Sequence, residues 1–156
     1  MKAYLIPALI SIFVFAVGCK KNSGCTPVSP DVEAPQIVEY NTKNGIITQQ
    51  FSNKIYYKIV DTGYVVHPTA SSSVVVTYSA KLLNNTVFDV ATSPVTFKLS
   101  DVIEGWQIGL PLLQKGGRMI LIIPSAYAYG CNGNSKLKVP ENSVLFYDIK
   151  LIDIIP

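Results

Sequence analysis

Residues 102–113 read VIEGWQIGLPLL, an apolar segment whose periodicity differs from that of the sequence around it. Four of its residues recur at steps of three and four, the spacing of one helix face: Ile103, Trp106, Leu110 and Leu113. The segment also contains Gly105 and Gly109, which disfavour a helix by intrinsic propensity. We therefore expect one short helix, stabilised by packing of its apolar face.

The segments on either side alternate with period two and are rich in β-branched and aromatic residues, as is typical of strands. The alternating sets are Ile55, Tyr57 and Ile59; Val74, Val76, Tyr78, Ala80 and Leu82; Val95, Phe97 and Leu99; Met119, Leu121 and Ile123; and Leu145, Tyr147, Ile149 and Leu151. Several antiparallel strands and one apolar helix predict an α+β domain, in which one face of the sheet packs on that helix.

The bulk composition limits the classes of function. A chain of 156 residues has room for one domain with short appendages. The formal net charge is only +3, and no basic run exceeds the pair Lys20 and Lys21. This argues against nucleic acid as a partner, because its binding normally requires a concentrated basic patch.

Several catalytic chemistries lack their residues. His67 is the single histidine and precedes a proline in a polar stretch, so a Ser–His or Cys–His nucleophile is not expected. The three cysteines are far apart in sequence and accompanied by no histidine pair, which argues against zinc. The chain also contains no phosphate-binding glycine motif. We expect neither a metal nor a cofactor.

The N-terminus has the pattern of a targeting segment. Lys2 precedes an apolar run over residues 3–18, which is shorter than the ~20 residues of a spanning helix and suits a secretory signal. Residues 16–19 read Ala-Val-Gly-Cys and resemble the lipobox of bacterial lipoproteins, in which the cysteine is acylated. This resemblance implies a lipidated Cys19 and a membrane anchor. A plain cleaved signal and an uncleaved anchor are the alternatives.

The residues after Cys19 predict a tether. Up to about residue 34 they are Ser, Pro, Asn, Gly and charged residues without an apolar period. Residues 35–43 predict a short helix with Ile37 and Tyr40 on one face. The chain is thus expected to comprise a signal peptide (1–18), a lipidated tether with a short extension (19–53) and one domain (54–156).

Four blocks of the domain, in this order and spacing, resemble the FKBP family of prolyl isomerases: Val76-Thr77-Tyr78-Ser79-Ala80, Val87-Phe88-Asp89, Val102-Ile103-Glu104-Gly105-Trp106, and Ile123-Pro124 leading to Tyr127-Ala128-Tyr129-Gly130. A fifth block, Val139-Pro140 followed by Ser143-Val144-Leu145-Phe146-Tyr147-Asp148, is similar to the closing strand of that family. The resemblance covers about residues 54–154. It implies a twisted antiparallel sheet wrapped around one short helix, with a shallow apolar pocket between them.

The resemblance also implies a site. Its pocket positions fall on Tyr78, Phe88, Asp89, Val95, Val102, Ile103, Trp106, Tyr129, Val139 and Tyr147. Trp106 would form the floor, Tyr129 would donate a hydrogen bond to a substrate carbonyl, and Asp89 would accept one from Tyr78. Asp89, Tyr129 and Trp106 are the expected catalytic residues, and the others would bind substrate.

Two positions depart from the family pattern. Val95 and Tyr147 stand where well-known members have phenylalanine, which predicts a wider or more polar pocket. The resemblance implies a monomeric prolyl isomerase acting on proline-containing polypeptides. The alternative is a peptide-binding or chaperone module of the same fold with little turnover.

If Cys19 is acylated, Cys25 and Cys131 are the remaining pair of thiols in an oxidising compartment. A bridge between them would close a loop of about 100 residues, which the chain-entropy relation values near 4.7 kcal/mol. Two unrelated free thiols are the alternative. Because Lys20 and Lys21 follow Cys19, surface export through an acidic signal is not supported, and we expect a lipid-anchored, periplasm-facing protein of the cell envelope.

Overall fold

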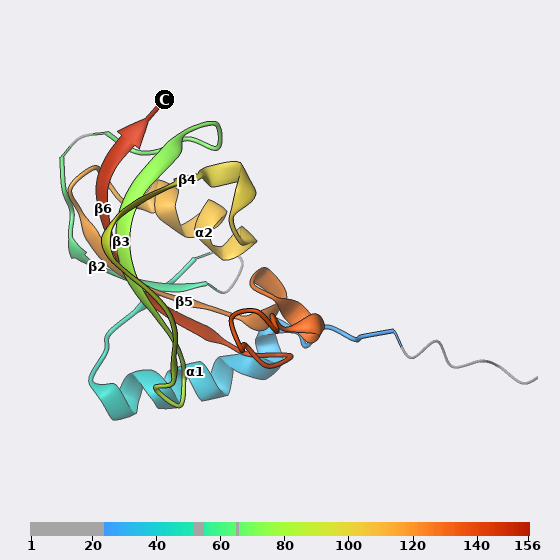
Figure 1. Cartoon of the computed structure of the whole chain (residues 1–156). Helices are drawn as coiled ribbons and strands as arrows, with labels where there is room; N and C mark the ends of the chain where they lie inside the picture. The colour runs from blue at the N-terminus through green and yellow to red at the C-terminus, as the bar shows by residue number, and fades with distance from the viewer. Residues whose placement is uncertain (1–23, 52–54, 65) are drawn as a thin grey trace, which may run out of the picture.

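A computed structural model describes residues 24–51, 55–64 and 66–156 of the chain (Figure 1). The predicted signal peptide and Cys19 lie outside the described residues. The helices are α1 (Pro30–Asn44) and α2 (Glu104–Gly109), with short 3-10 segments η1 (Leu99–Asp101), η2 (Leu110–Leu112), η3 (Ser125–Tyr127) and η4 (Gly130–Asn132). The strands are β1 (Gln49–Gln50), β2 (Tyr56–Asp61), β3 (Ser73–Leu82), β4 (Val87–Lys98), β5 (Arg118–Ile123) and β6 (Leu145–Ile155).

The strands form one antiparallel sheet in the order β1-β2-β5-β6-β3-β4, and the sheet curves around α2 (Figure 1). This confirms the predicted α+β class. Each of the five predicted strand segments lies in a strand or directly at its end. The third, β4, is much longer than predicted because it begins at Val87. The register of its pairing with β3 is irregular.

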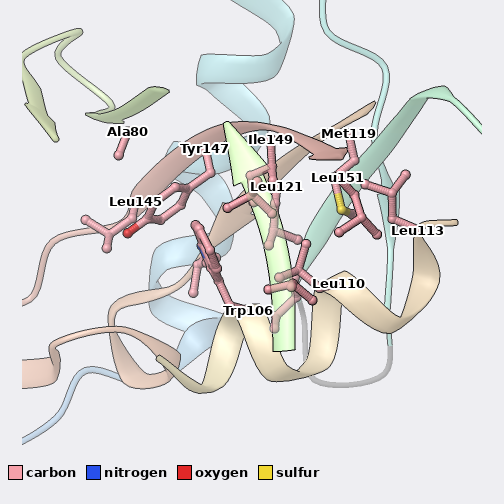
Figure 2. Packing of buried hydrophobic residues seen from close by; sticks show 14 of the residues in the cluster. Ala80, Trp106, Leu110, Leu113, Met119, Leu121, Leu145, Tyr147, Ile149 and Leu151 are labelled. Atoms are coloured by element: carbon pink, nitrogen blue, oxygen red, sulfur yellow. The ribbon is translucent and has the colours of Figure 1, made fainter. Parts of the chain in front are cut away.

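The inner face of the sheet packs on α2 and η2 and forms the main core (Figure 2). Its fully buried members include Val74, Val76, Leu99, Leu110, Met119, Leu121, Ile123, Leu145, Ile149 and Leu151. These residues come from the period-two sets of the strands and from the apolar face of residues 102–113. The predicted faces are therefore the buried ones.

Two glycines permit this close packing. A Cβ atom on Gly109 would lie 2.7 Å from the side chain of Leu121, and one on Gly105 would overlap the side chain of Ile123. The glycines that weaken the helix as a local element are thus what allow it to approach β5. As predicted, packing and not propensity stabilises α2, which ends at Gly109 and continues as a 3-10 turn.

Helix α1 covers part of the opposite face of the sheet, for which the sequence predicts no helical partner. Its apolar stripe joins a second buried cluster made of Ile37, Tyr40, Tyr56, Ile122, Val144 and Phe146. The sheet therefore packs on helices at both faces. Helix α1, which precedes the predicted domain boundary at residue 54, thus packs on the same sheet as the strands that follow that boundary.

Helix α1 starts earlier than predicted. The helix begins five residues earlier, at Pro30, and Ser29 caps it by accepting a hydrogen bond from the Asp31 amide. Proline suits the first helical position, where no amide donor is needed. Pro35, the first residue of the predicted helix, lies inside the observed one. The end of the helix agrees with the prediction, since Gly45 adopts a left-handed conformation (φ +63°).

Candidate active site

A pocket of about 320 Å³ opens between α2, the edge of β3 and β4, and the loop that follows β5. Its walls are Tyr78, Asp89, Phe97, Asp101, Val102, Ile103, Trp106, Tyr129, Leu137 and Tyr147. The structure thus brings together seven residues that the family resemblance assigned to one site: Tyr78, Asp89, Val102, Ile103, Trp106, Tyr129 and Tyr147.

Trp106 forms the centre of an aromatic cage. Tyr78 and Tyr147 meet its indole edge-on, each with 5.3 Å between ring centroids, and Phe97 does so at 5.8 Å. Edge-to-face contacts are favoured by the quadrupoles of aromatic rings. Only 4% of the surface of Trp106 is exposed, and Figure 2 shows its indole beside Tyr147 in the core.

The hydroxyl group of Tyr78 donates a hydrogen bond to Asp89 Oδ2 across 2.7 Å. The other carboxylate oxygen of Asp89 accepts from the Val90 amide at 2.9 Å. Burial raises the pKa of Tyr78. The hydrogen bond to Asp89 and the negative charge of Asp89 raise the pKa of Tyr78 further. Tyr78 therefore stays protonated at neutral pH and remains the donor in this pair.

Tyr129 belongs to the loop after β5 and lines the pocket. Burial raises the pKa of Tyr129, although interactions with the side chains of Asn134 and Tyr147 act to lower it. Burial raises the pKa of Tyr147 as well. Tyr129 therefore stays protonated at neutral pH and can donate a hydrogen bond to another group.

Three residues assigned by the resemblance do not line the pocket. Phe88 packs edge-on against Tyr147 at 6.0 Å, and Val139 is buried. Val95 is half-buried opposite Val76 on β3. In place of Val95, the wall is formed by Phe97.

Phe97 lies two residues further along the same face of β4. It was not among the predicted pocket residues, although the period-two alternation of the strand places it on the same face as Val95. Its ring reaches both Tyr78 and Trp106, which the shorter side chain of Val95 does not. Leu137 and Asn134 were also missed. Both belong to the irregular loop after η4, where no periodic pattern marks a residue that faces inward.

His67 is not among the residues that line this pocket. Its Nδ1 lies 2.9 Å from the Pro111 carbonyl oxygen, and its Nε2 lies 3.2 Å from the Gln114 side-chain nitrogen. The ring is exposed and links a loop to the end of the α2–η2 segment. Its role in the structure is that of a connecting residue.

Comparison with known proteins identifies the family. The profile of the FKBP-type peptidyl-prolyl cis-trans isomerases matches residues 65–152. The chain belongs to this family. It is 39% identical over 119 residues to the probable FKBP-type isomerase FkpA of Neisseria meningitidis, with 74% of this chain and 43% of that protein covered.

Other FKBP-type relatives show the same pattern. FkpA of Escherichia coli K12 is 37% identical over 108 residues, which cover 67% of this chain and 39% of that protein. The isomerase Mip of Coxiella burnetii is 33% identical and is covered to 50% of its length by 72% of this chain. The chain therefore spans about two fifths to one half of the length of these three relatives.

Solved structures of FKBP-type proteins have the same fold. A peptidyl-prolyl isomerase of Pseudomonas syringae superposes with a TM-score of 0.72 at 28% identity, covering 82% of this chain and 94% of that one. FkpA of Escherichia coli gives the same TM-score at 32% identity, covering 81% of this chain and 61% of that one. The chain thus shares its fold with these two proteins.

Proposed function

We propose that the chain is a peptidyl-prolyl cis-trans isomerase that accelerates rotation about Xaa-Pro bonds in extracytoplasmic polypeptides. The observation that carries this proposal is a preformed aromatic pocket, with Trp106 at its floor and tyrosine hydroxyl groups at its edge. The relatives described above are named as isomerases, and nothing in these comparisons favours a binding module without turnover.

The apolar part of the pocket supplies the main driving force. Rotation about a peptide bond meets a barrier of roughly 18–20 kcal/mol because resonance gives the C–N bond partial double-bond character. A twisted amide has lost part of this resonance and with it part of its charge separation. A dry pocket therefore binds the twisted form better than the planar one, which is the condition for catalysis. The pyrrolidine ring would stack on Trp106, between Phe97 and Ile103.

The hydroxyl groups at the edge of the pocket would orient the bound peptide. Tyr129 would donate a hydrogen bond to a carbonyl oxygen of the bound peptide, because burial raises its pKa and keeps its hydroxyl group protonated at neutral pH. The bond between Tyr78 and Asp89 would hold the opposite wall in place. No covalent step or proton transfer is required. This agrees with a sequence in which no Ser–His or Cys–His nucleophile is expected.

The decisive experiment measures turnover and binding on the same peptide. NMR exchange spectroscopy or a protease-coupled assay on an Xaa-Pro peptide should show accelerated isomerisation, with a peptide containing alanine in place of proline as the control for binding specificity. Saturable binding of the proline peptide without any acceleration would instead support the peptide-binding alternative and overturn the isomerase proposal.

We also propose that the chain is a lipoprotein of the cell envelope, monomeric and held by an acylated Cys19 facing the periplasm. The disulfide described below favours an oxidising compartment. Among the described residues, no helix is long and apolar enough to cross a membrane. Palmitate labelling should therefore be lost in Cys19→Ser and kept in Cys25→Ser, and absence of label from the wild type would contradict the anchor.

A further inference from the structure

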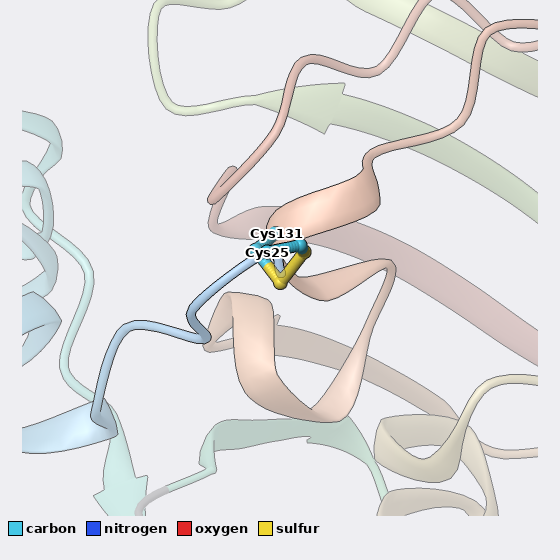
Figure 3. The surroundings of a disulfide bond; sticks show 2 residues. All are labelled: Cys25 and Cys131. Atoms are coloured by element: carbon cyan, nitrogen blue, oxygen red, sulfur yellow. A yellow bond between two sulfur atoms is a disulfide. The ribbon is translucent and has the colours of Figure 1, made fainter. Parts of the chain in front are cut away.

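The segment that precedes the family-matched region makes two long-range contacts with the loop after β5. Glu33 Oε2 in the first turn of α1 accepts a hydrogen bond from the Ser125 amide at 2.8 Å. Cys25 is joined to Cys131 in η4 by a disulfide, with 5.4 Å between their Cα atoms (Figure 3). These partners are 92 and 106 residues apart in sequence.

The two contacts lie on either side of Tyr129. Ser125 begins η3, and its carbonyl oxygen accepts from the Ala128 amide, which directly precedes Tyr129 in the chain. Cys131 follows Tyr129 by two residues. The short segment that carries the proposed rim donor is therefore attached to the N-terminal segment at both of its ends.

Glu33 is well placed to hold its partner in position. Only 2% of its surface is exposed, and Ser125 is completely buried. A carboxylate is not buried without cost, and a hydrogen bond from a backbone amide offsets part of that cost. One turn further along the helix, Ile37 anchors α1 in the second core, so Glu33 projects from a rigid element.

The rest of the domain holds the far side of the same loop. The Asn142 amide donates to the Gly130 carbonyl oxygen at 2.8 Å, and Asn134 exchanges two backbone hydrogen bonds with Val139. These bonds lie within the family-matched residues 65–152. The contacts from Glu33 and Cys25 come from outside that region and add to them.

We propose that the N-terminal segment is part of the active-site framework, with Glu33 and the Cys25–Cys131 disulfide acting as positioning elements for Tyr129. This inference rests on the proposed isomerase function for its kinetic consequence. Its structural consequence, an ordered segment 125–131, can be measured without any turnover.

The first test compares Glu33→Ala with Glu33→Gln, using Glu39→Ala as the matched control from the exposed face of α1. Glu33→Ala should lower kcat/KM about 3- to 10-fold, the size expected for one lost hydrogen bond, mainly through kcat. Glu33→Gln keeps an oxygen acceptor for the Ser125 amide and should restore most of the activity. Glu39→Ala should match the wild type.

A double-mutant cycle then separates positioning from general stability. If Glu33 acts through Tyr129, Glu33→Ala should cause no further loss in a Tyr129→Phe background. Independent, multiplicative losses would overturn the proposal, as would wild-type activity in Glu33→Ala.

Hydrogen exchange keeps the test valid even if the wild type shows no isomerase activity. In Glu33→Ala, amides of residues 125–131 should exchange about tenfold faster, while those of β6 should not change. Faster exchange in an inactive wild type would overturn only the proposed function. Unchanged exchange in residues 125–131 would overturn the positioning proposal, whatever the wild-type activity.

The disulfide offers a second and reversible perturbation. Mild reduction of the wild type should lower kcat/KM severalfold and speed exchange in residues 125–131, and reoxidation should restore both. The Cys25→Ser/Cys131→Ser double variant should show the reduced behaviour and no response to reductant. Equal activity and equal exchange in the oxidised and reduced proteins would exclude the disulfide from this role.

Discussion

The hydroxyl group of Tyr78 on β3 and the carboxylate of Asp89 on β4 form a hydrogen bond of 2.7 Å at the wall of the aromatic pocket. The same Tyr78 ring packs edge-on against Trp106. A polar pair thus holds one of the rings that surround the pocket floor. Chemistry at the edge of the site and packing at its centre are therefore coupled through a single side chain.

Breaking this pair should lower both catalytic efficiency and stability while the fold survives. Asp89→Ala leaves the Tyr78 hydroxyl without its acceptor, so we expect kcat/KM to fall about tenfold and the free energy of unfolding to fall by about 1–2 kcal/mol. Steady-state isomerase assays and urea denaturation measure the two effects. Tyr78→Phe should give a similar loss, and the double variant should be no worse than either single one. Additive losses would show that the two groups act separately.

Removal of the Tyr129 hydroxyl should lower turnover while the fold survives. Tyr129→Phe loses the donor to the substrate, so we expect kcat/KM to fall about 3- to 10-fold, and the loss of the hydroxyl group from a half-buried site should lower stability by about 1 kcal/mol. Isomerase kinetics and thermal unfolding are the measurements. Unchanged kinetics in this variant would remove Tyr129 from the site.

Phe97 should contribute to substrate binding and Val95 should not. Phe97→Leu removes an aromatic wall, so KM should rise about 2- to 10-fold. Val95→Ala shortens a residue that does not line the pocket and should leave KM within the error of the assay while lowering the melting temperature. Peptide titration monitored by the fluorescence of Trp106, the one tryptophan, provides an independent reading. A larger effect of Val95→Ala than of Phe97→Leu on binding would support the assignment by resemblance instead.

The close approach of α2 to β5 should make Gly105 intolerant of any side chain. In Gly105→Ala the added methyl group would overlap Ile123, and overpacking of this kind typically lowers the free energy of unfolding by about 1–3 kcal/mol. Gly24→Ala is the control, because a Cβ atom at Gly24 meets no other atom within 4 Å. Chemical denaturation of the two variants tests the difference. Equal stabilities would mean that α2 can move away from the sheet without loss.

Activity should be flat across neutral and mildly alkaline pH. Burial raises the pKa of Tyr78, Tyr129 and Tyr147, so all three remain protonated donors, and kcat/KM should not change between about pH 7 and 9. The folded protein keeps these protons when the unfolded chain begins to lose them near pH 10. Their stabilising contribution is therefore complete below about pH 10 and is lost as the pH rises towards the folded-state pKa values.

Denaturation at pH 9 and pH 11 measures this alkaline loss of stability. Tyr147→Phe should reduce the difference between the two conditions, and Tyr64→Phe, at an exposed position, should not. A fall in kcat/KM centred below pH 9 would contradict the assignment of protonated tyrosines.

The class of the fold follows from local patterns. Alternation along a strand and the three- and four-residue steps of residues 102–113 report which side chains face a core, since that geometry repeats within each element. The inner faces of β3, β5 and β6 and the packing of Trp106 were predictable for this reason. Family blocks added the pair of Tyr78 and Asp89.

What escaped prediction depends on contacts between distant residues. The true start of α1 rests on a serine–proline cap, and its membership of the folded unit rests on a second core on the other face of the sheet. The choice of Phe97 over Val95 depends on the length of a side chain across the pocket. Asn134 and Leu137 come from a loop without periodicity.

The sequence by itself therefore determined the elements, the main core and most of the residues that meet in the pocket, because each of these is written in short-range periodicity or in ordered blocks. Only the tertiary structure decided that Glu33 reaches Ser125 and that Cys25 reaches Cys131. Partners about a hundred residues apart are selected by the closure of the whole chain, and no local pattern carries that information.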